Sequence, residues 1–135
     1  LALVKDPLNF SRPVLTRVQP EFTLADVFGG SKPPTRAQLH NSLRAIHENG
    51  SGVLIYLRRP NLGECQSQLS SWQTAIDKKP ASMMREYGLG AQILRDLGVN
   101  SIELLTGSNK QLSGLTTFGI EISGQRPIPT FEALQ

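Results

Sequence analysis

Short runs of apolar residues alternate along the chain with segments in which apolar residues recur every three or four positions. The run at residues 53–57, Val-Leu-Ile-Tyr-Leu, is continuously apolar, which is typical of a strand buried on both faces. The first few residues of the chain also read as a strand. Three further runs have the length and apolar character of strands, at residues 13–18, 102–105 and 120–122.

Helical spacing fills the intervals between these runs. A helix is expected to begin near Thr35, because Thr35 and Gln38 have the spacing of a capping box, and to end at Asn49-Gly50. Strands that alternate with helices predict an α/β domain, layered around a mixed or parallel sheet with flanking helices. Three more helices are predicted, at residues 69–76, 91–97 and 110–116.

Composition narrows the class of protein. The chain has 135 residues, 39% of them hydrophobic, and we expect one domain over residues 1–135 with a buried core. Its net charge of +3, without long basic runs, argues against a nucleic-acid partner. The lone Cys65 and the lack of a long apolar stretch favour a cytoplasmic location without a membrane partner. Because the chain opens at Leu1 inside a predicted strand, we expect it to be a fragment of a longer polypeptide.

A long segment in the second half of the chain resembles a known family. Residues 87–99, Tyr-Gly-Leu-Gly-Ala-Gln-Ile-Leu-Arg-Asp-Leu-Gly-Val, and the Ser-Ile-Glu-Leu-Leu-Thr that follows at 101–106, resemble a signature of GTP cyclohydrolase II. The segments at residues 2–5, 13–18 and 52–58 agree with that family in order and spacing. Its members open the imidazole ring of GTP and release formate and pyrophosphate at the first step of riboflavin synthesis. They are often fused behind a dihydroxybutanone phosphate synthase domain. The resemblance therefore implies an upstream synthase domain, and we expect a homodimer.

The family holds a zinc ion with three cysteines, and all three are replaced in this chain. The family segment RVHSECLTGD matches residues 17–26 and places Phe22 at the first cysteine. The segment SLRCDCG matches residues 30–36 and places Pro33 and Thr35 at the other two. None of these side chains supplies a thiolate, so we expect neither zinc nor any other cofactor.

Other residues with metal-binding or nucleophilic chemistry favour ordinary structural roles. His40 and His47 share one face of a predicted helix, but two histidines without a third ligand favour a solvated surface over a metal site. Cys65 favours an inert thiol over a nucleophile, because no histidine is near it in the sequence. Asp26 matches an acidic residue of the zinc segment, and without metal we favour a cap or turn contact near Gly29-Gly30.

The catalytic segments of the family are also incomplete. The family's QEGRGIGL loop matches residues 59–66, where only Gly63 is clearly kept, and the region from 58 to 85 is roughly ten residues shorter than expected. In the family an aspartate precedes by two positions an arginine that is proposed to attack the α-phosphate. Here Met83 matches the aspartate and Arg85 matches the arginine. We therefore assign no catalytic residue. Arg85 is the one member of the family's aspartate–arginine pair that this chain keeps.

Part of a phosphate-binding site is still expected. Arg85 can bind two phosphate oxygens at once through its guanidinium, although we favour an ion pair at the surface with Glu86 or a neighbour. Gly88 and Gly90 are expected to present backbone amides at the start of a helix, or else to permit a tight turn or close packing. The family's TNNPxK loop keeps its first residue and has a glutamine at the lysine position, beside a neighbouring lysine. The predicted phosphate contacts are Arg85, Gly88, Gly90, Thr106 and Lys110.

Two functions follow from this pattern. The favoured one is a catalytically degenerate cyclohydrolase-like module for interaction, dimerisation or regulation of a fused 3,4-dihydroxy-2-butanone 4-phosphate synthase, without GTP cyclohydrolase II activity of its own. The reason is selective loss: apolar core positions are kept while metal and base positions are replaced. The alternative is a metal-independent enzyme or sensor that binds a phosphorylated nucleotide or sugar.

Overall fold

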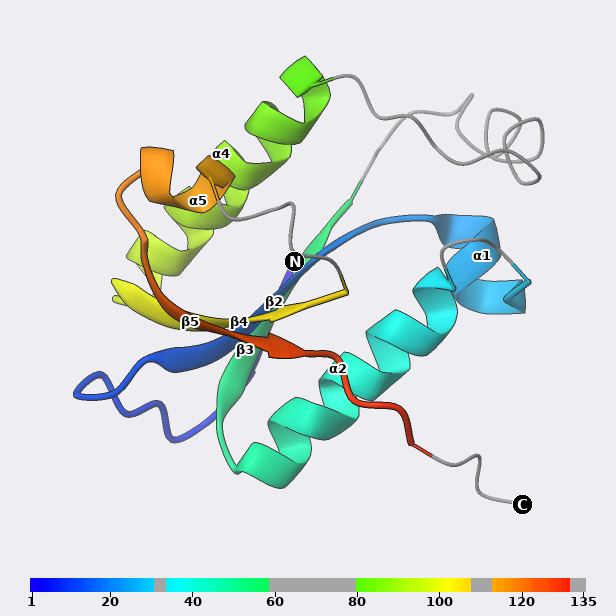
Figure 1. Ribbon diagram of the computed structural model, residues 1–135, viewed down its shortest axis with the longest axis horizontal. Coiled ribbons are helices and arrows are strands. Elements are labelled where there is room, and N and C mark those ends of the chain that lie inside the picture. Colours follow the sequence, from blue (N-terminus) through cyan, green and yellow to red (C-terminus); the bar gives the residue numbers. More distant parts are fainter. Residues whose placement is uncertain (31–33, 59–79, 108–112, 132–135) are drawn as a thin grey trace.

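A mixed five-stranded sheet forms the centre of the domain (Figure 1). The computed structural model describes residues 1–30, 34–58, 80–107 and 113–131. The strand order is β1-β3-β2-β4-β5, with β1 antiparallel to β3 and the other neighbours parallel. The strands are β1 (Ala2–Lys5), β2 (Val14–Pro20), β3 (Gly52–Leu57), β4 (Ser101–Thr106) and β5 (Glu121–Pro127). The α/β class and the mixed sheet predicted from the sequence are confirmed.

Helices cover both faces of this sheet (Figure 1). One face packs against the longest helix of the first half of the chain through Ala45 and Ile46, which meet Leu15, Leu54 and Leu105. The other face carries a larger apolar cluster, closed by residues of the second half such as Ala91, Leu94 and Leu115. The helices are α1 (Thr23–Phe28), α2 (Thr35–Asn49), α4 (Pro80–Asp96) and α5 (Ser113–Thr117).

Helix α2 ends where the sequence predicts but begins without the predicted cap. Its C-terminal Gly50 adopts a left-handed φ of 87°, and the Gly50 amide donates to the carbonyl of His47 at 3.1 Å. At the other end, Pro34 is the N-cap residue and no side chain caps the helix. The expected capping box of Thr35 and Gln38 is wrong, because Thr35 is already the first helical residue and its side chain is buried.

Helix α4 begins well before the position expected from its sequence. It starts at Pro80, so Gly88 and Gly90 lie inside the helix rather than at its N-terminus. The two glycines instead allow close packing: a Cβ at Gly88 would lie 3.1 Å from the Phe118 ring, and one at Gly90 would lie 3.7 Å from Val18. Close packing was the alternative left open for these residues, and it is what the helix uses.

Two other helix predictions fall partly or wholly outside the described ranges. The helix expected at residues 69–76 lies in a segment that the structure does not describe. The one expected at residues 110–116 is seen as α5 from Ser113 onward. Helix α1 had no counterpart among the predictions, because six residues are too few to show helical periodicity.

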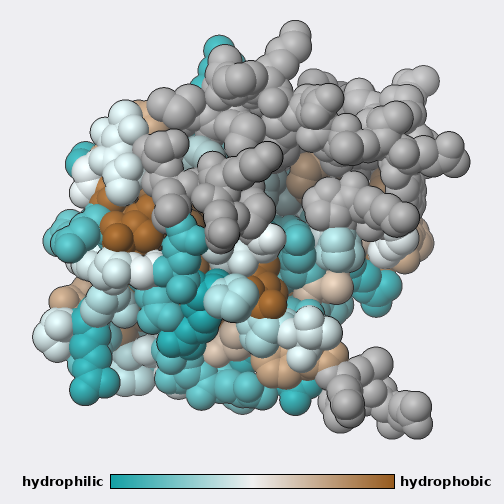
Figure 2. Space-filling view, viewed as in Figure 1, coloured by the Kyte–Doolittle hydropathy of each residue, from teal (hydrophilic) through white to brown (hydrophobic). Residues whose placement is uncertain are grey.

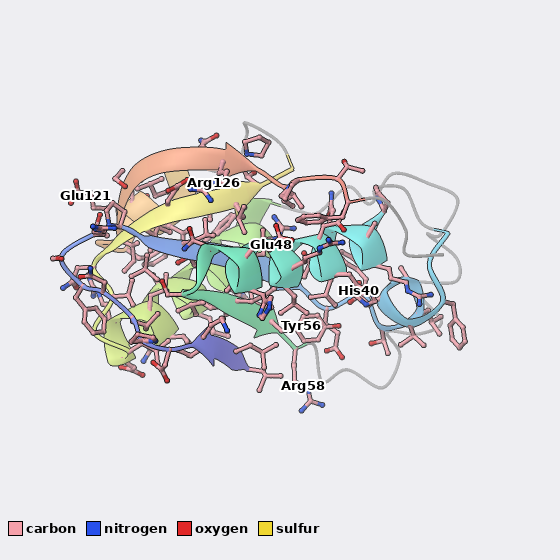
Figure 3. All side chains as sticks on the ribbon, turned by 90° about the horizontal axis from the view of Figure 1, so that it is seen from below. His40, Glu48, Tyr56, Arg58, Glu121 and Arg126 are labelled. Carbon is pink, nitrogen blue, oxygen red and sulfur yellow. The ribbon has the colours of Figure 1, made fainter. Side chains whose placement is uncertain are left out.

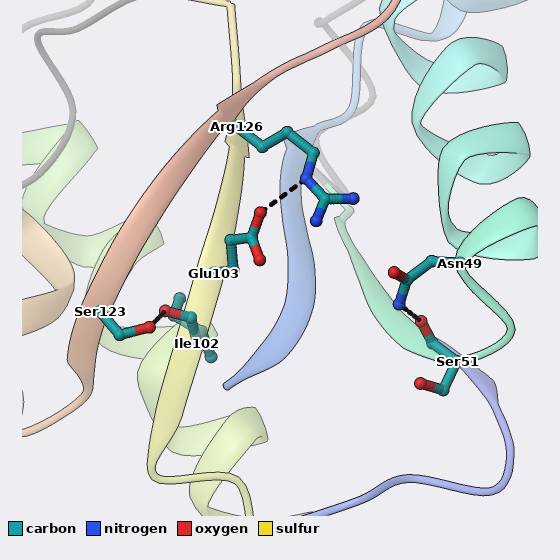
Figure 4. Close-up of polar contacts among 6 residues, drawn as sticks. All are labelled: Asn49, Ser51, Ile102, Glu103, Ser123 and Arg126. Carbon is teal, nitrogen blue, oxygen red and sulfur yellow. Dashed lines mark hydrogen bonds and ion pairs between the residues drawn. The ribbon is translucent and has the colours of Figure 1, made fainter. Parts of the chain in front are cut away.

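Polar contacts hold the edge strand β5 against β4 and stabilise the turn after α2 (Figure 4). Arg126 on β5 forms an ion pair with Glu103 on β4 at 2.6 Å, and the Ser123 hydroxyl donates to the carbonyl of Ile102 at 3.1 Å. Asn49 donates through Nδ2 to the carbonyl of Ser51 at 2.9 Å, which closes the turn into β3. The Ser123 and Asn49 contacts lie away from the carboxyl ends of the parallel strands, whereas Arg126 stands one residue before the end of β5 and is the register partner of Leu105.

The parallel arrangement gathers the ends of several strands at one edge of the sheet. Strands β2, β3 and β4 run in the same direction, so Pro20, Leu57 and Thr106 mark a common carboxyl edge. Helix α4 starts on this side and runs back across the sheet (Figure 1). In α/β sheets this edge is where ligands usually bind.

The visible surface in the standard view is largely hydrophilic over the described residues. Figure 2 shows apolar side chains there as separate spots between polar ones. None of the described helices is long and apolar enough to cross a membrane. Large apolar residues with notable exposure come from several elements and loops: Leu1, Leu3, Val4, Phe10, Val27, Phe28, Leu43, Leu89 and Phe118.

Candidate functional site

A buried arginine at the centre of β2 contacts the end of β4 through its side chain. Arg17 on β2 is 6% exposed, and its Nε and Nη2 atoms donate to the Gln19 Oε1 atom at 3.0 and 2.7 Å. Its Nη1 atom donates to the carbonyl of Leu105 on β4 at 3.3 Å. Gln19 in turn donates through Nε2 to the carbonyl of Thr35 at 3.4 Å. One guanidinium and one amide therefore tie β2 to β4 and to the start of α2.

The charge of this arginine is not neutralised by the group that holds it. The side chain of Gln19 is a neutral amide, and in the described part of the chain no carboxylate contacts Arg17. Burial lowers the pKa of Arg17 to about 10, and the interaction with Tyr87 opposes this shift. The group therefore remains a cation at neutral pH. A buried cation without a counter-charge favours binding of an anion.

Tyr87 on α4 lies within electrostatic range of this cation. Its ring packs closely against Gly114 of α5, at a place where a Cβ would overlap the ring. Burial raises the pKa of Tyr87 to about 12, with a further contribution from Glu86 and an opposing one from Arg17. The hydroxyl is therefore neutral over the physiological range.

A second polar group lies next to the first, on the face of the sheet beneath α2. The Tyr56 hydroxyl on β3 donates to the Asp26 Oδ2 atom at 2.6 Å, and the Phe22 amide donates to the same oxygen at 3.0 Å. Within the described ranges the other oxygen of Asp26, Oδ1, is buried without a hydrogen-bond partner. Tyr56 and Gln19 are register partners on neighbouring strands. Figure 3 shows Tyr56 beside α2 and Arg58 beyond it at the end of β3.

The environment of Tyr56 keeps its proton in place. Burial raises the pKa of Tyr56 well above its usual value, the hydrogen bond and charge of Asp26 add to this, and Glu21 contributes further. Arg58 opposes the shift. The contact expected for Asp26 near Gly29-Gly30 is instead made at the other end of α1, with the Phe22 amide. The reason is that the carboxylate serves the N-terminal turn of that helix.

The positions that match the family's zinc ligands have structural roles in the described ranges. Phe22 is the N-cap residue of α1 and is 8% exposed, while Thr35 opens α2 and is 3% exposed. Pro33 lies outside the described residues. A phenyl ring offers no lone pair to a metal and a hydroxyl is a poor zinc ligand. In the described part of the chain no group of three or more His, Cys, Asp or Glu side chains could hold a metal ion. The donor set therefore does not fit zinc.

The residues predicted to bind phosphate are only partly brought together. Thr106 is buried at the end of β4, directly after the carbonyl that Arg17 contacts. Arg85 is exposed in the first half of α4, on the side of the carboxyl edge. Gly88 and Gly90 are excluded as free amide donors, because they lie inside α4. Lys110 lies outside the described residues.

Other candidates from the sequence are placed as follows. His40 and His47 are both exposed on α2, and Figure 3 shows His40 on that helix. Cys65 lies outside the described residues, and so does the side chain of Met83.

The sequence reasoning overlooked Arg17, Gln19 and Tyr87. A signal for Arg17 was present: it is the one charged residue in the otherwise uncharged run at residues 13–18, which was expected to be a strand. A cation inside a strand that is expected to be buried indicates a partner or a ligand at that point. The roles of Gln19 and Tyr87 depend on packing between distant elements, which sequence spacing does not reveal.

Comparisons with known proteins agree with this architecture. The family model described as GTP cyclohydrolase II matches residues 1–127. Riboflavin biosynthesis protein RibBA of Bacillus mycoides (strain KBAB4) is 36% identical over 146 residues, covering 98% of this chain and 36% of the relative. RibBA of Bacillus cereus (strain G9842) is 36% identical over 140 residues, covering 95% and 35%. RibBA of Bacillus cytotoxicus is 35% identical with the same coverage. The chain thus spans about a third of the length of these relatives.

Proposed function

The chain belongs to the GTP cyclohydrolase II family, and from that membership we propose that it is a domain of a riboflavin biosynthesis protein that no longer opens the GTP ring. The observation that carries the proposal is the state of the zinc positions. Phe22 is buried as part of the fold, and Thr35 begins a helix. Zinc lowers the pKa of a bound water from far above neutrality to about 7, so without the metal the nucleophile that hydrolysis requires is not formed.

The retained core supports a role for this domain within a larger protein. Relatives of about three times its length are named riboflavin biosynthesis proteins. We propose that the domain is joined to a 3,4-dihydroxy-2-butanone 4-phosphate synthase domain and serves its folding, homodimerisation or regulation. A cytoplasmic location, favoured by the single cysteine, is part of this proposal.

A second function rests on a separate observation at the carboxyl edge. Arg17 is a buried cation held by a neutral amide, which favours an anionic ligand. We propose that this edge binds a phosphorylated nucleotide or sugar, with Arg17 as the central contact and Arg85, Thr106 and Lys110 as further contacts. In this form the domain is a metal-independent enzyme or a sensor.

Zinc content tests the first proposal directly. The protein is refolded with excess zinc, passed over a desalting column and measured by elemental analysis. The matched comparison is the triple variant Phe22→Cys, Pro33→Cys and Thr35→Cys, which restores three thiolates at the family's positions. The wild type is expected to retain far less than one zinc per chain, and the variant to retain about one. One tightly held zinc per wild-type chain would overturn the proposal.

A further inference from the structure

We propose that Gln19 is a charge-sparing positioning residue: it fixes the Arg17 guanidinium with a neutral acceptor, so that the positive charge stays available to a phosphate-bearing ligand at the carboxyl edge. This inference rests on the second proposed function and gives it a specific device. It explains how the affinity of the site for an anion is maintained. Gln19 influences binding indirectly, by positioning Arg17, and does not itself contact the ligand.

The geometry of the contact fixes both side chains. The Gln19 Oε1 atom accepts from Nε at 3.0 Å and from Nη2 at 2.7 Å, so one oxygen holds one side of the guanidinium. The other end of the amide donates to the carbonyl of Thr35 at 3.4 Å. Reversing the amide would place two donors against the guanidinium and two oxygens against each other, so its orientation is determined.

Donor capacity remains on the guanidinium after these contacts. Five N–H groups belong to an arginine side chain, and three take part in the bonds to Gln19 and Leu105, which leaves two. By this count one remaining N–H lies on each terminal nitrogen. Two such groups match the two oxygens that phosphate presents to a guanidinium. In the described ranges no protein group takes up these two N–H groups.

The neutrality of the acceptor is the essential point. A glutamate at position 19 would have the same length and could accept the same two hydrogen bonds, so an ion pair would hold Arg17 more strongly. It would lose the donation from Nε2 to the carbonyl of Thr35. It would also cancel the charge that attracts an anion. Gln19 is 1% exposed, so the cancellation would take place in a poorly solvated site where charges act strongly.

A purely structural role for Gln19 predicts a different ranking of variants. If the amide only supported the fold, ligand binding would follow stability, and Gln19→Glu, which keeps an acceptor for Arg17, would bind better than Gln19→Met. If the amide leaves the charge of Arg17 available, the order of the variants by stability is the reverse of their order by anion affinity. Gln19→Glu is expected to be more stable than Gln19→Met, because it keeps an acceptor for Arg17, but to bind an anion poorly. Gln19→Met, of similar length without an acceptor, is expected to be less stable but to bind better than Gln19→Glu.

The test is calorimetric titration with inorganic pyrophosphate at low salt, together with urea unfolding of each variant. Gln92→Glu is the matched control, because it adds the same charge at an exposed position on α4, the helix on the opposite face of the sheet. Relative to the wild type, we expect Gln19→Glu to weaken binding at least tenfold. Gln19→Met is expected to weaken it less, and Gln92→Glu to leave it within about twofold.

The outcomes separate this inference from the proposed function on which it rests. Wild-type protein that binds no pyrophosphate would overturn the anion site, and the inference with it. Wild type and Gln19→Glu binding equally well would overturn the role of Gln19 alone. If Gln19→Glu fails to fold, Gln19→Met decides: complete loss of binding in a folded Gln19→Met variant would show that the acceptor, and not its neutrality, is what the site needs.

Discussion

Tyr56 and Asp26, 30 positions apart in the sequence, meet in a 2.6 Å hydrogen bond that joins β3 to helix α1. The same carboxylate oxygen receives the Phe22 amide at 3.0 Å. One buried acidic side chain therefore secures the short helix that follows Phe22.

Tyr56→Phe tests the strength of that contact. Removing the hydroxyl leaves a buried carboxylate with fewer donors, so the free energy of unfolding is expected to fall by about 1–3 kcal/mol. Urea unfolding followed by circular dichroism measures the change. Tyr87→Phe is the matched control, because no hydrogen bond of the Tyr87 hydroxyl is found in the described residues. Equal losses in the two variants would contradict the importance assigned to the Asp26 contact.

Phe22→Ala tests how much the buried ring at position 22 contributes to the core. Phe22 is 8% exposed, whereas Phe28 at the end of the same helix is 70% exposed. Truncation at position 22 is expected to cost about 3–5 kcal/mol, and truncation at position 28 about 0.5 kcal/mol or less. Thermal and urea unfolding of the two variants provide the comparison. A small effect at Phe22 would mean that the ring is not needed for stability.

Gly52→Ala tests the tight approach between α2 and the sheet. Gly52 has a φ of 154°, and a Cβ there would lie 2.7 Å from the carbonyl oxygen of Leu15 and 2.9 Å from Ile46. The substitution is expected to cost about 3 kcal/mol or more, because backbone and core must both shift. Gly50→Ala, with a φ of 87° and no atom within 4 Å of its Cβ, should cost only about 1 kcal/mol. The reverse order in urea unfolding would be inconsistent with this packing.

The raised pKa of Tyr87 predicts a loss of stability in alkaline solution. The unfolded chain releases this proton near the ordinary pKa of 10.0, whereas the folded chain holds it to about 12. The folded state therefore binds more protons between these values, and the free energy of unfolding decreases as pH rises through that window. Comparing wild type with Tyr87→Phe in urea from pH 9 to 12 isolates this contribution. Parallel pH profiles for the two proteins would show that burial does not shift the pKa of Tyr87.

The sequence was most informative where apolar residues are continuous or periodic over enough length. The run at residues 53–57 identified β3, and Asn49-Gly50 identified the end of α2. The start of α4 was missed because Gly88 and Gly90 resemble a turn. Their true role depends on contacts with Phe118 and Val18, and such tertiary contacts override local preference.

For the candidate site, the sequence predicted which residues stand at the positions of the family's zinc ligands, but it did not predict the contacts between side chains. That Phe22 and Thr35 carry no thiolate could be read directly from the chain, since the chemistry of a ligand is a property of one residue. The hold of Gln19 on Arg17 could not, although the two residues are close in sequence. Two positions apart on a strand places them on one face, but the neutral, bidentate contact depends on burial beneath α2.

Formate release from GTP tests the central claim most directly. Purified protein is incubated with GTP, magnesium and zinc, and formate is measured against a heat-treated sample, with RibBA of Bacillus mycoides assayed alongside as the reference. We predict no formate above the heat-treated level, because the positions of the zinc ligands no longer provide thiolates and no activated water is formed. Sustained formate release that disappears in Arg85→Ala would contradict the account, since it would place a working ring-opening site in this chain.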